Sequence, residues 1–254
     1  MSQEIAIKIS NLKKSFDGGN EFILKGIDLE IPKNQITVII GYSGTGKSVL
    51  LKHILGLLRP TSGSIEVFGR DLWSTSEEEI AKMRCNFGVL FQHAALFDDM
   101  SVLENVSFPL REHRRDLSPR EVIRISEKKL QQSGLENKHF NKLPGELSGG
   151  MRKRAGLARA LALDPDILLY DEPTTGLDPI LTEMVDNLIL ETHRSHEGGT
   201  SVIVSHDLSA AFRLGDNVVM LDKGKVLLRG TPDDFINSDH ELVRRFVDKG
   251  LRKE

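Results

Sequence analysis

The sequence lacks several features that would place it in other classes of protein. It has one cysteine among 254 residues, so no disulfide can form within the chain, and this favours a reducing compartment. No apolar run approaches the roughly 20 residues of a membrane-spanning helix, and MSQEIAIKIS at the start lacks the regions of a signal peptide. No Gly/Ser-rich or Pro-rich linker divides the chain, and its net charge of −3 gives no indication of a nucleic-acid partner. We therefore expect one domain with subdomains, cytosolic or membrane-associated only through partners.

The histidines do not predict a metal site. None of the eight has zinc-ligand spacing. His193 and His196 could share one face of a helix, but the sequence offers no third ligand. A solvated helix end is the better interpretation of this pair.

Three short apolar runs predict the core of the fold. They are ITVII (36–40), ILLY (167–170) and SVIVS (201–205), each bounded by turn or polar residues. Apolar runs without alternation are typical of strands buried on both faces of a parallel sheet. Helical patterns lie between them, notably at 48–58 and 180–193. The sequence therefore predicts an α/β fold with a mainly parallel sheet.

Two further regions have different patterns. EIAIKISNL alternates, FILKGIDLEI follows after the turn DGGN, and GSIEVFG comes near residue 65, which together predict an added antiparallel sheet. Residues 100–143 are rich in charge and helical spacing, and Ser118 with Pro119 is typical of a helix start. We expect a helical subdomain there, with a solvated charged face that includes Arg111, Arg114 and Arg115.

The segment GYSGTGKS (41–48) has the spacing of a phosphate-binding loop between a buried strand and a helix. Gly41, Gly44 and Gly46 allow backbone NH groups to approach phosphate oxygens. Lys47 would reach the β and γ phosphates, and the Ser48 hydroxyl would be a ligand of Mg²⁺. A glycine-rich turn with an exposed lysine is the alternative, which both the spacing and the context disfavour.

Polar residues at the ends of other predicted strands complete a hydrolytic site. Asp171 and Glu172 follow ILLY, where strand ends of an open α/β sheet face the ligand crevice. Asp171 would hold Mg²⁺ through its water shell, and Glu172 would be the base that orients the attacking water. His206 follows SVIVS and could donate a hydrogen bond to the γ-phosphate, although a structural histidine is as good an interpretation. Gln92 follows FGVL, and its side-chain amide could bind Mg²⁺ or the attacking water.

The segment LSGGMRKRAGLARAL (147–161) predicts a helix with a spare anion site at its start. Ser148 resembles an N-cap, and Gly149 and Gly150 leave the next NH groups uncovered. The spacing alone favours an ordinary capped helix. In that interpretation Met151, Ala155, Ala158 and Leu161 pack inward, and Arg152, Lys153, Arg154 and Arg159 lie largely in water.

Taken together, these motifs resemble those of the ATP-binding cassette (ABC) ATPases over nearly the whole chain. The matching motifs are Walker A at GYSGTGKS, the Q-loop at Gln92, the signature at LSGGM, Walker B at ILLYDE, the D-loop at GLDP with Asp178, and the switch histidine at His206. The resemblance implies a single nucleotide-binding domain with a P-loop NTPase fold. Its RecA-like core and antiparallel β subdomain would occupy residues 1–92 and 160–254, and a helical subdomain carrying the signature would occupy about 93–159.

The resemblance also implies the cofactors and the site. The chain would bind and hydrolyse ATP with Mg²⁺, and two copies would face each other head to tail, so that one copy completes the ATP site of the other. Residues implied to bind nucleotide are Phe16, Gly41, Ser43, Gly44, Gly46, Lys47, Ser48 and Val49. Those acting from the second copy are Ser148, Gly149, Gly150 and Asp178. Phe16, in LKKSF, stands where most of the family has an adenine-stacking tyrosine.

Two departures from the usual ABC motifs are informative. Met151 stands where most ABC ATPases have glutamine, and Tyr42 stands where proline is frequent. Methionine followed by a basic run is similar to the MlaF-like ATPases of MCE-type lipid transporters. That resemblance implies a membrane permease, an MCE-type lipid-binding protein, often a STAS-domain subunit, a phospholipid or related substrate, and a peripheral position on the cytoplasmic side of the inner membrane.

Other classes of P-loop protein are alternatives to this interpretation. The chain could serve another class of ABC transporter, such as a small-molecule importer. A soluble ABC ATPase acting on ribosomes or DNA usually has two cassettes or a long coiled-coil insertion, and a P-loop kinase or GTPase has no signature motif. Near the end, Leu242, Phe246 and Val247 have helical spacing, which predicts a helix that covers its own core or contacts a partner.

Overall fold

The computed structural model describes residues 4–195 and 199–251 and divides the chain into two compact units. Unit 1 comprises residues 1–84 and 197–254, and unit 2 comprises residues 85–196. The helical subdomain expected at 93–159 lies inside unit 2. Within the described residues, no helix is long and apolar enough to cross a membrane.

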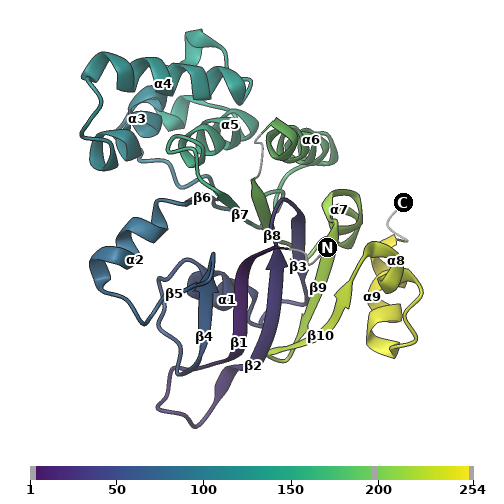
Figure 1. Cartoon of the computed structure of the whole chain (residues 1–254). Helices are drawn as coiled ribbons and strands as arrows, with labels where there is room; N and C mark the ends of the chain where they lie inside the picture. The colour runs from purple at the N-terminus through teal and green to yellow at the C-terminus, as the bar shows by residue number, and fades with distance from the viewer. Residues whose placement is uncertain (1–3, 196–198, 252–254) are drawn as a thin grey trace. The chain divides into compact units, whose positions relative to one another are not determined.

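Unit 1 contains the antiparallel sheet that the alternating segments predict. Its strands are β1 (Ile5–Ser15), β2 (Phe22–Pro32), β4 (Ser62–Val67) and β5 (Arg70–Asp71), in the order β2-β1-β4-β5. All neighbouring strands are antiparallel, and Ile7 of β1 pairs with Ile31 of β2 and with Val67 of β4. These three side chains are buried, so the apolar half of each alternating strand forms one face of the core. Figure 1 shows β4, β1 and β2 side by side.

A second, mostly parallel set of strands in unit 1 carries the nucleotide-binding motifs. Strand β3 (Ile36–Ile40) pairs in parallel with β8 (Thr200–Val204) and with β9 (Asn217–Asp222), and β10 (Lys225–Gly230) is antiparallel to β9. Every residue of β3 and β8 is buried. This explains why their sequences are continuous apolar runs. The helices of this unit are α1 (Lys47–Ile54), α2 (Glu77–Arg84), α7 (Leu208–Leu214), α8 (Pro232–Ile236) and α9 (Glu241–Leu251).

Helix α1 is shorter than the sequence pattern predicts. The apolar spacing continues to Leu58, but the helix ends at Ile54. Gly56 follows in the left-handed region, with φ of 64°, and the Leu57 NH donates to the Lys52 carbonyl at 2.9 Å. This is the bond of a Schellman motif, which ends a helix whatever the apolar spacing beyond it.

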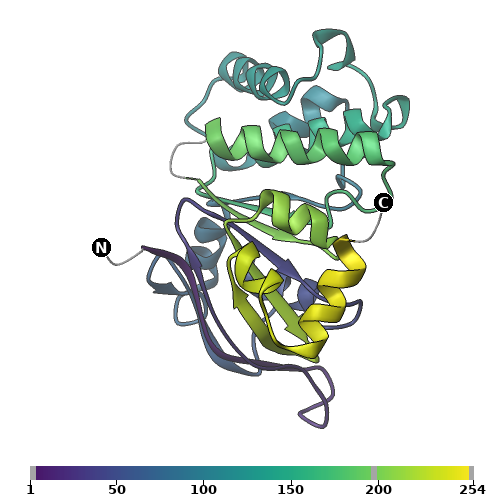
Figure 2. The same cartoon turned by 90° about the vertical axis from the view of Figure 1, so that its right-hand side faces the viewer.

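The C-terminal helix covers the core of its own unit. Val243, Phe246 and Val247 of α9 are buried, and Leu242 is half-buried. Helix α9 packs beside α7 and α8, as Figure 2 shows in yellow and green. Of the two interpretations of this amphipathic segment, packing on its own core is therefore confirmed.

Unit 2 combines two parallel strands with a group of helices. Strand β6 (Phe87–Leu90) pairs in parallel with β7 (Ile167–Asp171). The helices are α3 (Val102–His113), α4 (Pro119–Gln132), η1 (Asn137–His139), η2 (Pro144–Glu146), α5 (Gly149–Ala160) and α6 (Pro179–Ser195). Val102, Val106, Leu130, Leu147 and Ala158 are among the side chains of their shared core. His193 lies in the last turn of α6, and His196 lies outside the described residues.

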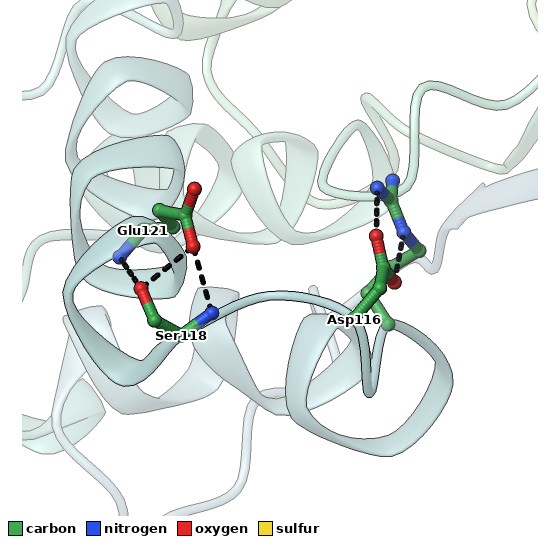
Figure 3. A network of polar contacts seen from close by, with 4 residues as sticks. Asp116, Ser118 and Glu121 are labelled. Carbon is green, nitrogen blue, oxygen red and sulfur yellow. Dashed lines mark hydrogen bonds and ion pairs between the residues drawn. The ribbon is translucent and has the colours of Figure 1, made fainter.

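Helix α4 begins where the Ser118–Pro119 pair predicts. Figure 3 shows the capping box: the Glu121 NH donates to the Ser118 hydroxyl at 3.4 Å, and the Ser118 NH donates to the Glu121 carboxylate at 2.8 Å. Just before it, Arg114 forms an ion pair with Asp116 at 2.8 Å. Arg111, Arg114 and Arg115 are exposed, as expected of a solvated face.

Candidate functional site

The phosphate loop connects β3 to α1 in unit 1. Gly46 is the N-cap of α1 and has φ of 103°, a conformation that favours glycine. Gly41 is required for a different reason, because a Cβ there would lie 2.5 Å from the Leu221 carbonyl oxygen. Ser43, Gly44 and Ser48 are exposed, and Val49 is half-buried. The loop thus presents backbone and hydroxyl groups to solvent at the positive end of a helix.

Lys47 is held across this loop. Its side chain is buried, and its Nζ donates to the Gly41 carbonyl at 2.8 Å and to the Tyr42 carbonyl at 3.2 Å. The Thr45 hydroxyl also donates to the Tyr42 carbonyl, at 2.8 Å. Lys47 is therefore directed along the loop rather than into water, which differs from the exposed lysine of the alternative interpretation.

Two other predicted residues of unit 1 lie near strand ends or on the surface. His206 follows β8, and the Ser205 NH donates to the Ile39 carbonyl at 3.0 Å. His206 is exposed. Because β3 and β8 are parallel neighbours, His206 follows the same edge of the sheet from which the phosphate loop departs. Phe16 is 59% exposed, and the Lys14 ammonium lies 5.0 Å from the centre of its ring. An exposed ring with a cation over one face leaves the other face for stacking.

In unit 2, Gln92 and the acidic pair follow the two parallel strands. Leu90 of β6 pairs with Tyr170 of β7, so Gln92 and Asp171 follow neighbouring strand ends. Asp171 and Glu172 are both half-buried. Glu172 has φ of 49°, and the Thr175 hydroxyl donates to its carboxylate at 2.8 Å. A non-glycine residue in this conformation is restrained by its surroundings, and such residues cluster at functional sites.

The signature segment forms a capped helix as predicted. The Met151 NH donates to the Ser148 hydroxyl at 3.3 Å, and Ser148 is exposed while Gly150 is buried. Gly149 lines a cavity of about 390 Å³ together with Gln92, Lys153 and Asp178. The Asp178 carboxylate caps α6 by accepting from the NH groups of its second and third residues, both at 3.0 Å. Unit 2 thus brings the predicted Q-loop, signature and D-loop to one cavity.

The basic run after the signature is not solvated, contrary to the expectation from spacing. Lys153 is only 4% exposed, and its Nζ donates to the Gln92 carbonyl. The other three basic residues are half-buried. Arg152 donates to the Leu147 carbonyl, and Arg154 donates to the Ser133 carbonyl. Arg159 donates to the carbonyls of Ala94 and Ala95. Each basic side chain of the run therefore connects α5 to a neighbouring loop through hydrogen bonds.

Burial changes the acid–base properties of two of these side chains. Desolvation lowers the pKa of Lys153 from 10.5 to about 8, and burial also lowers the pKa of Arg159. No local pattern indicates this burial, because the partners of the two side chains are carbonyls 61 to 65 residues away in the chain. The role of α5 as a support for the Q-loop was therefore missed.

Comparisons with known proteins agree with this arrangement of motifs. A family model described as ABC transporter matches residues 24–175. The chain is 44% identical over 247 residues to the probable ribonucleotide transport ATP-binding protein Mkl of Mycobacterium leprae, covering 97% of this chain and 70% of that protein. It spans 66% of the corresponding Mycobacterium tuberculosis protein.

A second relative and a solved structure cover most of their own length. The chain is 40% identical over 248 residues to the intermembrane phospholipid transport system ATP-binding protein MlaF of Haemophilus influenzae, covering 97% of this chain and 91% of that protein. It is similar to a dimeric, post-hydrolysis structure of the ATP-binding cassette MJ0796 bound to ADP and Pi, with a TM-score of 0.80 and 33% identity over 89% of this chain and 98% of that one. The chain therefore belongs to the ABC transporter family and is one of its ATP-binding, ATP-hydrolysing members.

Proposed function

We propose that this chain supplies the ATPase activity of a transporter that moves a phospholipid or related lipid through a membrane permease. The observation that carries the proposal is its similarity to Haemophilus influenzae MlaF, because the match covers 91% of a relative named for phospholipid transport. Met151 and the basic residues after it support the same group.

The phosphate loop of unit 1 is the proposed nucleotide site. Its backbone NH groups and Lys47 would bind the phosphates, and adenine would stack on the open face of Phe16. Ser48, Gln92 and Asp171 are the proposed Mg²⁺ ligands, because hydroxyl, amide and carboxylate oxygens are the hard donors that Mg²⁺ prefers. When bound, Mg²⁺ neutralises charge on the β and γ phosphates.

Glu172 is the proposed general base. Its carboxylate is fixed by the Thr175 hydroxyl and by a restrained backbone, so it can orient a water toward the γ-phosphate and accept its proton. His206 would donate a hydrogen bond to the γ-phosphate, and the Gln92 amide would help to place the water. These roles require positioned groups, which the local geometry of each residue supports.

Each ATP site is proposed to need a second copy of the chain. Ser148, Gly149 and Gly150 form a capped helix start in which Ser148 is exposed and Gly149 is half-buried, and a single nucleotide bound at the phosphate loop leaves this second anion site unused. Head-to-tail pairing would bring it, with Asp178, to the ATP of the partner copy. The dimeric structure of the MJ0796 cassette supports the pairing of two copies.

The remaining partners follow from the proposed transport role. ATP-driven closure of the pair would be passed to the permease through the surface near residues 92–106, and hydrolysis would reset it. The complex would include an MCE-type lipid-binding protein and a STAS-domain subunit, with this chain held on the cytoplasmic side of the inner membrane.

The change Glu172→Gln tests the catalytic assignment. The variant should still bind ATP and form closed dimers, but its turnover should fall by at least about 100-fold, because an amide cannot accept the proton. Steady-state ATPase activity and gel filtration with ATP measure both effects. Glu77→Gln, on the exposed face of α2, is the control and should match the wild type. Undiminished ATPase activity of Glu172→Gln would disprove the assignment of the base.

A ribonucleotide or another small molecule is the second candidate substrate, because Mkl is 44% identical and is named for ribonucleotide transport. The two can be separated by purifying the Glu172→Gln variant from native membranes and identifying the associated proteins and small molecules by mass spectrometry. Recovery of a permease with phospholipid supports lipid transport. Recovery of the permease with nucleotide-like substrates and no lipid-binding subunit supports the alternative.

A further inference from the structure

The aromatic residue of the phosphate loop contacts the C-terminal helix. The rings of Tyr42 and Phe246 meet edge to face, with centroids 5.1 Å apart and an interplanar angle of 89°. Phe246 is 8% exposed within α9, whereas Tyr42 is 44% exposed. The contact therefore joins a half-exposed loop residue to a fixed residue of the core.

Tyr42 is also the residue whose backbone organises the loop. Its carbonyl accepts hydrogen bonds from the Thr45 NH at 3.3 Å, the Thr45 hydroxyl at 2.8 Å and Lys47 Nζ at 3.2 Å. Because side chain and carbonyl belong to one residue, the ring contact restrains the acceptor that directs Lys47. A proline at this position would restrain the backbone by its own ring, whereas tyrosine relies on an external partner.

Helix α9 makes a second close contact one turn further along the same face. A Cβ on Gly250 would lie 2.7 Å from the Cβ of Leu208, so the backbone of α9 approaches the first residue of α7 closely. Leu208 comes two residues after His206. One helix therefore contacts both the phosphate loop and the segment that follows the switch histidine.

We propose that Phe246 and Tyr42 are positioning residues through which α9 holds the phosphate loop in its nucleotide-binding conformation. The inference rests on the proposed role of this loop as the nucleotide site. Holding the loop in advance reduces the ordering that binding requires, so the pair raises nucleotide affinity without touching the nucleotide. The C-terminal helix thereby sets the affinity of the site.

Binding of MgADP to the full-length chain tests the proposal, with a fluorescent ADP analogue as the reporter. Phe246→Leu and Tyr42→Leu should each raise the Kd by about 2- to 10-fold, the range expected for one aromatic pair. The Kd of the double variant should be no higher than that of the single variant with the higher Kd, because both changes remove the same ring contact. Tyr42→Phe keeps the ring and should keep the wild-type Kd.

Phe235→Leu is the matched control. Phe235 is buried in α8 of the same unit and meets Phe212 edge to face, with ring centroids 6.2 Å apart. Its loss should lower stability and leave the Kd unchanged. Because Tyr42 is half-exposed, Tyr42→Leu keeps the test valid if Phe246→Leu does not fold.

The outcomes separate this proposal from the assignment of the site. Lys47→Ala should abolish MgADP binding, and retained binding in that variant would overturn both. Two other outcomes would overturn the role of α9 and leave the site assignment standing. In the first, Lys47→Ala abolishes binding while the Kd of Tyr42→Leu stays within 2-fold of the wild type. In the second, the effects of the two leucine changes on the Kd simply multiply. A raised KM for ATP with unchanged kcat in Tyr42→Leu would support positioning.

Discussion

Replacing Lys153 with methionine tests why a cation is buried inside the signature helix. The lysine is 4% exposed, and its ammonium donates a hydrogen bond to the Gln92 carbonyl. Methionine has a similar length and no charge, so the variant removes the ion while it keeps most of the packing. We expect the free energy of unfolding to rise and ATP turnover to fall.

The magnitude follows from the pKa of Lys153. Burial lowers it from 10.5 to about 8, and at about 1.4 kcal/mol per unit this corresponds to a cost of roughly 3 kcal/mol for the charged form at pH 7. The lost charged hydrogen bond is worth about 1.5 to 3 kcal/mol, and the lower end applies because Gln92 lines a cavity where water can replace the lysine. The Lys153→Met variant should therefore gain about 1.5 kcal/mol.

Urea unfolding at pH 7 and steady-state ATPase activity measure the two effects. Lys128→Met is the matched control, because Lys128 is exposed on α4, and its change should stay within about 0.5 kcal/mol of the wild type. Turnover of Lys153→Met should fall several-fold, since the Q-loop loses one of its supports. A loss of more than 1 kcal/mol, or unchanged turnover, would refute the reasoning.

Three further predictions concern stability. Burial lowers the pKa of His53 below 6.5, so the unfolded chain binds more protons than the folded chain at acid pH. The free energy of unfolding should therefore fall as the pH drops below 6.5. In urea titrations at several pH values, this fall should be less steep for His53→Gln than for the exposed control His113→Gln. Tyr170 has a buried hydroxyl with no hydrogen-bond partner among residues 4–195 and 199–251, so Tyr170→Phe should gain about 1 kcal/mol by the same assay, and a loss would contradict this. A Cβ on Gly88 would lie 2.3 Å from the carbonyl oxygen at the end of α5, so Gly88→Ala should cost about 1 to 3 kcal/mol in thermal unfolding, whereas Gly145→Ala, in open space, should cost little.

The elements that local patterns determine could be predicted from the sequence. The runs at 36–40 and 167–170 could be predicted as strands because burial on both faces favours apolar residues at nearly every position, and this is visible in a window of five residues. The start of α4 was predicted for a similar reason, since Ser118 and Pro119 are adjacent in the sequence. The end of α1 was predicted wrongly, because one left-handed glycine outweighed the apolar spacing.

Contacts between distant segments could not be predicted in this way. A basic residue on a helix looks the same in the sequence whether it lies in water or donates to a carbonyl of another loop. Lys153 and Arg159 do the latter with carbonyls more than 60 residues away. Tyr42 and Phe246 likewise come from opposite ends of the chain. The candidate motifs could be identified, whereas the groups that support them became visible only in the structure.

These supports give the basic run after the signature a physical reason. Ala94 and Ala95, just after Gln92, have φ of 61° and 48°, and each left-handed alanine costs on the order of 1 to 3 kcal/mol. Arg159 donates to both of their carbonyls, at 2.8 and 2.7 Å, and charged hydrogen bonds of about 1.5 to 3 kcal/mol each offset a strain of this size. Lys153 adds a third bond, to Gln92 itself.

These hydrogen bonds couple the signature helix to the Q-loop. The helix that begins with Ser148 also fixes the backbone of the Q-loop, so within unit 2 the two motifs cannot shift independently without breaking several charged hydrogen bonds. If Gln92 moves when it binds Mg²⁺ or the attacking water in its proposed role, α5 carries that displacement to the signature glycines. A solvated basic run would leave the two motifs uncoupled, and this difference explains why buried cations follow the signature despite their desolvation cost.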